Sequence, residues 1–199
     1  IRDDLVTGVQ TCALPICSIP DIDILIGGFP CQSFSTVNPN KDPFDERGKL
    51  YKDMAKILKD KKPAAFIAEN VKGLMVLKKG AIFQNVLKEF QKQGYCLNYK
   101  LLNAANFGIP QKRQRVFIVG IRNDLKKKYI FPENIFHEKA KLSQEKWTPL
   151  KKVINSIIPE DEKYYFSKKA VEGMKNAKNN MKRGLWQDLE APCLTITSH

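Results

Sequence analysis

One cysteine of the sequence stands where a nucleophile could act. Cys31 lies in the stretch GGFPCQSFS, Gly27–Ser35, directly after a short apolar run. A thiol attacks as its thiolate, which is a minor species at neutral pH unless cationic or hydrogen-bonding groups lie near it. Pro30 restricts the backbone before the thiol, and the polar residues after it favour a side chain that faces a cleft. Free cysteine is also among the most buried residue types, so Cys31 alone fits a packed core residue as well.

Cationic groups that could serve such a thiol occur in the stretch QKRQR. Gln111, Arg113 and Arg115 are spaced two apart, so an extended chain would direct all three side chains to the same side. A solvated basic edge strand remains the alternative interpretation.

A carboxylate ends the apolar run AAFIAEN, residues 64–70. Glu69 could cap a helix that begins in NVKGL. It could instead protonate, or hydrogen-bond to, a ring nitrogen of a bound base.

The strands that would carry these groups are short and apolar. Residues 23–27 (DILIG) and 64–70 are typical of strands buried on both faces of a parallel sheet. Residues 115–121 (RVFIVGI) supply a further strand, and residues 95–102 (YCLNYKLL) alternate Tyr95, Leu97, Tyr99 and Leu101 on one face.

Helical spacing lies between the strands. The first helical pattern stops before Pro63 and consists of Leu50, Met54, Ile57 and Leu58. The second is placed to end at Gly94 and consists of Ile82, Val86, Leu87 and Phe90. Strands that alternate with helices predict an α/β sheet, in which ligands bind at the carboxyl ends of strands, where Cys31 and Glu69 fall.

The pattern changes beyond about Arg122. The chain becomes lysine-rich, with short helices predicted in residues 148–159 (TPLKKVINSIIP) and 167–178 (SKKAVEGMKNAK). We interpret this part as a second, smaller module.

Charge and composition bound the function. The chain has 34 Lys and Arg against 21 Asp and Glu, a formal net charge of +13, which favours a polyanionic partner but also fits an ordinary lysine-rich surface. No apolar window approaches a membrane span of about 18 residues, so we expect a cytoplasmic protein without membrane contact. The five cysteines form no CxxC pair and the chain has two histidines, so we expect no metal site.

Four stretches appear together in a characteristic order: GGFPCQSFS, RGKLYKDMAKIL, ENVKGL and NFGIPQKRQRVFIVG. In order and approximate spacing they resemble the bacterial cytosine-C5 DNA methyltransferase family, and APCLTIT near the end is similar to a stretch that follows its target-recognition region. The resemblance covers nearly everything after residue 17 and is thin between about 125 and 188.

The resemblance implies a fold and a chemistry. The fold would be a partial Rossmann-like, S-adenosylmethionine-dependent methyltransferase sheet with a small target-recognition module. Cys31 would add to C6 of a flipped-out cytosine, so that C5 attacks the methyl group of S-adenosylmethionine. Glu69 would bond N3 and the exocyclic amine of the ring, and Arg113 and Arg115 would help to hold the base.

Further positions follow from the same resemblance. Pro30 and Leu50 would lie near the cofactor, and the residues expected to contact substrate or DNA are Gln32, Ser33, Ser35, Asn70 and Gln111. The partners would be double-stranded DNA and a cognate restriction endonuclease. The implied domains are a catalytic part over 17–124, the recognition region over 125–188 and a return to the catalytic domain over 189–199.

The first residues do not fit this scheme. One reverse translation of residues 1–16 matches a common sequencing-library index adapter in frame, so we expect them to be non-native. The cofactor-binding stretch of the family would then be missing, and we expect the chain by itself to be an inactive fragment. Two residues depart from the family pattern: Asn38 replaces a usual glycine, and Cys193 a usual threonine.

Two alternatives stay open, and a third, thymidylate synthase, does not fit the motifs. A tRNA cytosine-C5 methyltransferase would share the thiol chemistry, although FPCQSFS favours DNA. Thymidylate synthase also uses a Pro-Cys thiol, but its motif continues with histidine and has no place for ENV or QKRQR. A non-catalytic DNA-binding remnant would keep the basic surface without the reaction.

Overall fold

The computed structural model describes residues 16–29, 51–141, 143–154, 165–176 and 187–195. The chain divides into two compact units. The first comprises Ile1–Leu101 and Arg115–Phe131, and the second comprises Leu102–Gln114 and Pro132–His199.

A four-stranded sheet forms the first unit, in the order β1-β2-β5-β3. These strands are β1 (Ile24–Gly28), β2 (Ala65–Val71), β5 (Gln114–Arg122) and β3 (Tyr95–Asn103). β1 and β2 are parallel, whereas β2 and β5 are antiparallel. The predicted α/β class is therefore confirmed as a mixed sheet rather than a purely parallel one.

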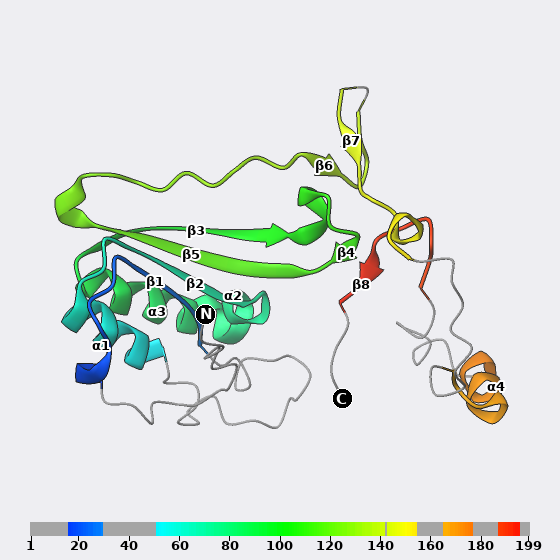
Figure 1. The fold of residues 1–199 in the computed structure, drawn as a ribbon, viewed down its shortest axis with the longest axis horizontal. Coiled ribbons are helices and arrows are strands. Elements are labelled where there is room, and N and C mark those ends of the chain that lie inside the picture. The colour runs from blue at the N-terminus through cyan, green and yellow to red at the C-terminus, as the bar shows by residue number, and fades with distance from the viewer. Residues whose placement is uncertain (1–15, 30–50, 142, 155–164, 177–186, 196–199) are drawn as a thin grey trace, which may run out of the picture. The chain divides into compact units, whose positions relative to one another are not determined.

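Helices cover one face of this sheet (Figure 1). They are α1 (Tyr51–Lys61), α2 (Gly73–Val76) and α3 (Ala81–Lys92). The predicted helical patterns are confirmed in α1 and α3, which bury Met54 and Leu58, and Val86, Leu87 and Phe90. Gly94 follows α3 with a φ of +89°, a left-handed conformation that glycine adopts without strain.

Aromatic rings make up much of the core between sheet and helices. Phe66 is fully buried, and its ring meets Phe90 and Tyr95 edge-to-face at centroid distances of 5.1 and 5.2 Å. The Tyr95 hydroxyl donates to the Pro63 carbonyl oxygen at 2.7 Å. Burial raises the pKa of Tyr95, which therefore remains a hydrogen-bond donor.

The prediction that the strand over 23–27 is buried on both faces is wrong. Ile24 and Ile26 are 58% and 72% exposed, while Leu25 between them packs against the core. The described helices cover only the Leu25 side, so alternate residues of β1 lie in different surroundings.

The described residues of the second unit form two short strand pairings and separate helical segments. β4 (Gln111–Lys112) pairs in parallel with β8 (Cys193–Leu194), and β6 (Phe136–His137) with β7 (Glu145–Lys146). Of the two predicted helices, the second is present as α4 (Lys168–Asn176), where Ser167 Oγ accepts from the Ala170 amide at 3.2 Å. The first appears within the described residues as a short 3-10 turn, Leu150–Lys152.

Within the described residues, no helix is long and apolar enough to cross a membrane. The same residues hold no cluster of three or more His, Cys, Asp or Glu side chains placed to bind a metal.

Candidate active site

The carboxyl ends of β1 and β2 lie side by side. Their register pairs Gly28 with Glu69 as the last pair of β1, which confirms that the strand leading to Cys31 and the strand of Glu69 end at the same edge. A Cβ placed on Gly28 would lie 3.4 Å from Glu69 Oε2. The Glu69 carboxylate therefore lies beside the backbone at Gly28, just before the Phe29-Pro30-Cys31 stretch, and a side chain at this position would touch it.

Arg115 on β5 holds the carboxylate of Glu69. Antiparallel pairing sets Arg115 opposite Val71, and Glu69 lies two residues away on the same face, so Arg115 and Glu69 are diagonal neighbours. Arg115 Nε lies 2.9 Å from Glu69 Oε1, and the two side chains are 20% and 37% exposed. A charge-assisted hydrogen bond in this range sets the orientation of the carboxylate and leaves the pair partly accessible from solvent.

Asn70 points to the opposite, helix-covered face of β2. It is 3% exposed, and it continues the buried alternation of Phe66 and Ala68 along the strand. Its Nδ2 donates to the Phe29 carbonyl oxygen at 3.0 Å, and its Oδ1 accepts from the Val71 amide at 2.9 Å. The structure thus gives Asn70 a buried position with backbone partners, which differs from the DNA contact expected from the sequence.

Phe29 is fixed through its side chain as well. The residue is 8% exposed, and its ring meets those of Tyr51 and Phe90 edge-to-face at 6.3 and 6.4 Å. Phe29 was not predicted from the sequence, although an aromatic residue between a buried strand and a proline is of a kind that packs into a core.

Gln111 and Arg113 belong to the second unit, whereas Arg115 belongs to the first. The expectation of one extended run from 111 to 115 is wrong, because the strand is interrupted at Arg113. The Arg113 amide donates to the Gln111 carbonyl oxygen at 3.0 Å, which closes a tight turn. Across such a turn, side chains two residues apart no longer point to the same side of the chain. The turn arises where the chain leaves its pairing with β8 and enters the main sheet at Gln114.

Lys112, between these residues, joins several segments of the second unit and was missed by sequence reasoning. Its Nζ lies 3.4 Å from Glu138 Oε1 and 5.2 Å from the centroid of the Trp147 ring. Its carbonyl oxygen accepts from Thr195 Oγ1 at 2.9 Å. These partners are distant in sequence, so no local pattern around Lys112 could have indicated them.

Six of the predicted site residues fall outside the described residues. They are Pro30, Cys31, Gln32, Ser33, Ser35 and Leu50.

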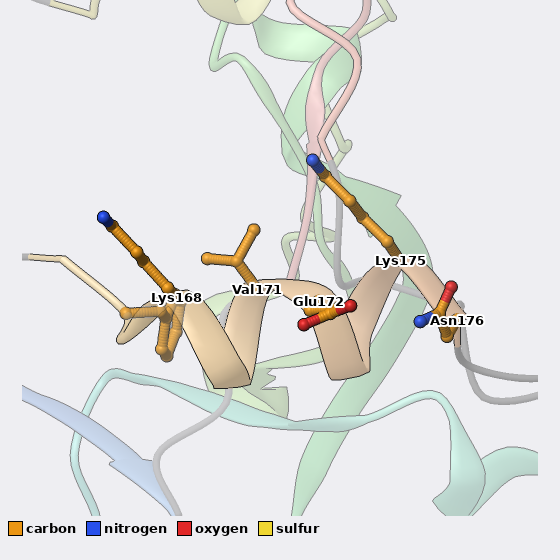
Figure 2. A pocket seen from close by; sticks show the side chains of 6 residues that line it. Lys168, Val171, Glu172, Lys175 and Asn176 are labelled. Atoms are coloured by element: carbon orange, nitrogen blue, oxygen red, sulfur yellow. The ribbon is translucent and has the colours of Figure 1, made fainter.

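A hollow of about 530 Å³ lies along α4 (Figure 2). Its lining consists of Phe166, Lys168, Val171, Glu172, Lys175 and Asn176. Lys168, Val171 and Lys175 point to the same side of the helix, as their spacing of three and four residues requires. Its lining carries two lysines and one glutamate, and it contains none of the predicted catalytic residues that the structure describes.

The sequence of this chain is similar to known proteins over most of its length. The profile of a family described as C-5 cytosine-specific DNA methylase matches residues 7–191. The type II methyltransferase M.DsaV of Dactylococcopsis salina is 39% identical over 168 residues, which are 84% of this chain and 45% of that protein. The type II methyltransferase M.NgoBI of Neisseria gonorrhoeae is 45% identical over 117 residues, which are 59% of this chain and 36% of that protein.

The chain thus spans less than half the length of these relatives. Among solved structures, the S. pombe Dnmt2 methyltransferase matches with a TM-score of 0.56 and 19% identity over 90% of this chain and 55% of that one. At this identity the likeness shows the mixed α/β fold alone.

Proposed function

Because the chain belongs to the C-5 cytosine-specific DNA methylase family, we propose that the whole protein carrying it is a DNA (cytosine-5-)-methyltransferase. The observation that carries the proposal is the Glu69–Arg115 pair, set beside the end of the strand that leads to Cys31. The type II relatives support a place in a restriction-modification system, with a cognate restriction endonuclease as partner.

Cys31 is the proposed nucleophile. Its thiolate adds to C6 of a cytosine, which makes C5 electron-rich enough to take up a methyl group. Loss of the proton at C5 then expels the thiolate and restores the aromatic ring. The methyl group comes from S-adenosylmethionine, the donor of this family.

Glu69 is proposed to bond N3 and the exocyclic amine of the cytosine, so that charge moving into the ring during thiolate addition is stabilised. Arg115 acts on the base through Glu69, whose carboxylate it orients at 2.9 Å. Arg113 is proposed as a second cationic group for the base.

Pro30 and Leu50 are the proposed neighbours of S-adenosylmethionine, on a sheet of the Rossmann-like methyltransferase type. Both residues lie outside the described part of the chain, so their assignment rests on the family motifs that contain them.

Duplex DNA is the proposed substrate. A cytosine in the stack has its reactive face covered, so it must leave the helix at a cost of a few kcal/mol, which contacts with phosphates can offset. The net charge of +13 supports such contacts, and Lys168 and Lys175 on α4 are candidates within the proposed recognition region over 125–188. The proposed contacts near the base are Gln32, Ser33, Ser35 and Gln111.

The decisive experiment measures transfer of tritiated methyl groups from S-adenosylmethionine to mixed-sequence duplex DNA by the full-length protein. Cys31→Ser should abolish transfer while DNA binding is largely kept, because serine is a far weaker nucleophile at neutral pH. Cys96→Ser serves as the matched control, since Cys96 lies on β3 and has no proposed role. Transfer by Cys31→Ser at the rate of the unchanged protein would reject the proposal in favour of a DNA-binding protein without this chemistry.

The substrate class is tested in parallel. The same assay on tRNA and on duplex DNA separates the two nucleic acids, and we expect incorporation into DNA. Incorporation into tRNA alone would keep the thiol chemistry and reject the DNA substrate.

A further inference from the structure

Asn70 is, apart from the Tyr95 hydroxyl, the one polar side chain buried among the described residues. Burying an amide costs free energy unless its donors and acceptor find partners. Here Nδ2 donates to the Phe29 carbonyl oxygen and Oδ1 accepts from the Val71 amide. Its partners are thus one local backbone group and one that lies 41 residues away in the chain.

The distant partner lies where the strand ladder stops. Pairing between β1 and β2 ends at Gly28 and Glu69, so Phe29 is the first residue of β1's chain beyond the sheet. At that point the Asn70 side chain supplies the hydrogen bond that the ladder no longer provides. It therefore extends the connection between the two strands by one residue.

Phe29 is consequently held on two sides. Its ring is packed edge-to-face against Tyr51 and Phe90, and its carbonyl oxygen is bound by Asn70. That carbonyl belongs to the planar peptide group that joins Phe29 to Pro30. Because a proline ring also fixes φ near −65°, few soft torsions separate the held carbonyl from residue 31.

We infer that Asn70 is a positioning residue that sets the direction in which the chain leaves β1 toward Cys31. The inference rests on the proposed function of Cys31. Adjacent residues of β2 then serve the reaction from opposite faces: Glu69 faces Arg115, and Asn70 holds Phe29. One strand would thereby set the distance between the nucleophile and the carboxylate that bonds the base.

The test substitution removes the hydrogen-bond donor of the Asn70 side chain and keeps the size of that side chain. In the full-length protein, Asn70→Asp retains an acceptor for the Val71 amide and removes the donor to Phe29. Because misplacement of a reacting group by about 1 Å costs about 100-fold in rate, we expect kcat for methyl transfer to fall by about 10- to 100-fold. KM values for DNA and S-adenosylmethionine should change by less than about 3-fold, since the change affects alignment rather than binding.

A matched control separates positioning from general loss of stability. Ile118→Val removes one methylene from the same core at a side chain that is 1% exposed and lies on β5, away from Phe29. Both variants are assayed well below their unfolding midpoints. In addition, alkylation of Cys31 by iodoacetamide is followed against pH with fragment-ion mass spectrometry. The alkylation rate profile should shift in Asn70→Asp and stay unchanged in Ile118→Val.

The inference is overturned if Asn70→Asp and Ile118→Val have equal kcat and the same Cys31 alkylation profile. If Asn70→Asp does not fold, Asn70→Ser decides, because its shorter side chain also withdraws the donor from the Phe29 carbonyl. Failure of the proposed function looks different: Cys31→Ser would then retain transfer in a protein whose Asn70 is unchanged.

Discussion

At the scale of single residues, the pairing of Glu69 with Arg115 is the most specific feature of the candidate site. Both partners project from neighbouring strands on one face of the sheet, and their contact of 2.9 Å joins a guanidinium Nε to one carboxylate oxygen. A guanidinium has a planar set of donors, whereas an ammonium acts as a compact point charge. The orientation of the carboxylate should therefore depend on arginine and not only on a positive charge.

Arg115→Lys tests this dependence in the full-length protein. We expect kcat/KM for methyl transfer to fall by about 10-fold, because lysine keeps the charge and loses the fixed direction of the donor. Arg122→Lys is the control, since Arg122 forms the same kind of pair with Asp124 at the other end of β5. Equal activity of Arg115→Lys and the unchanged protein would show that charge alone suffices.

A second prediction at this scale concerns the core. A Cβ on Gly120 would lie 2.1 Å from Phe66 Cε1, and the Phe66 ring is confined between Phe90 and Tyr95. Gly120→Ala should therefore lower the free energy of unfolding by about 1–3 kcal/mol through overpacking, as measured by urea denaturation. Gly27→Ala is the control, because its Cβ meets no atom within 4 Å. An equal effect of both substitutions would mean that Phe66 can move aside.

At the scale of elements, the end of β5 is held by Arg122. Its Nε and one terminal nitrogen donate to the two carboxylate oxygens of Asp124 at 2.7 and 3.2 Å, and the other terminal nitrogen donates to the Lys62 carbonyl oxygen. The hydrogen bond from Arg122 is the main cause that lowers the pKa of Asp124 below its ordinary value of 3.8. One side chain thus connects β5 to the turn that follows α1.

The lowered pKa predicts a pH dependence with a definite sign. A carboxyl group whose pKa is lower in the folded protein stabilises the fold above its unfolded-state pKa, and this contribution is lost as pH falls through the folded-state value. The thermal unfolding midpoint should therefore decrease less below about pH 4 in Asp124→Asn than in the unchanged chain. Parallel pH curves for the two proteins would contradict a stabilising role of the Asp124 carboxylate.

At the scale of the whole molecule, the chain divides into two compact units. The first unit has the aromatic core around Phe66. In the second unit, Trp147 Nε1 donates to Asn106 Oδ1 at 2.9 Å. Lys112 Nζ also lies over the Trp147 ring, 5.2 Å from its centroid. The Trp147 indole therefore joins two segments of the second unit, Asn106 and Lys112, through one side chain.

Trp147→Phe should loosen the second unit selectively. Phenylalanine keeps a ring for Lys112 but has no donor for Asn106, so the Ile135 amide, which donates to the Asn106 carbonyl oxygen, should exchange its hydrogen faster. Amides of β2 and α3 should exchange at unchanged rates. Tyr95→Phe is the reciprocal control, since it removes a buried hydroxyl from the first unit. Uniform acceleration across both units would show that they unfold together.

Much of the first unit could be predicted from local sequence. The periodicity of apolar residues predicted α1, α3 and all four strands of the main sheet, because the facing of a side chain depends only on its position in a helix or strand. The motif around Glu69 and QKRQR correctly indicated family membership. The parallel neighbourhood of β1 and β2 also followed from the strand and helix alternation.

Other features depend on contacts between distant residues. The antiparallel direction of β5, the exposure of Ile24 and Ile26, and the interruption of the strand at Arg113 are decided by what each segment pairs with. The same holds for Lys112, whose partners Glu138 and Trp147 follow 26 or more residues later in the chain.

By itself, then, the sequence determined the family and predicted which residues carry the chemistry, since motif order, residue type and periodicity are local properties. Only the tertiary structure decided that Arg115 reaches Glu69 and that Asn70 turns inward to Phe29. These choices arise from strand direction and register, which set the face and the neighbour of every side chain, and register is determined by burial and pairing across the whole sheet.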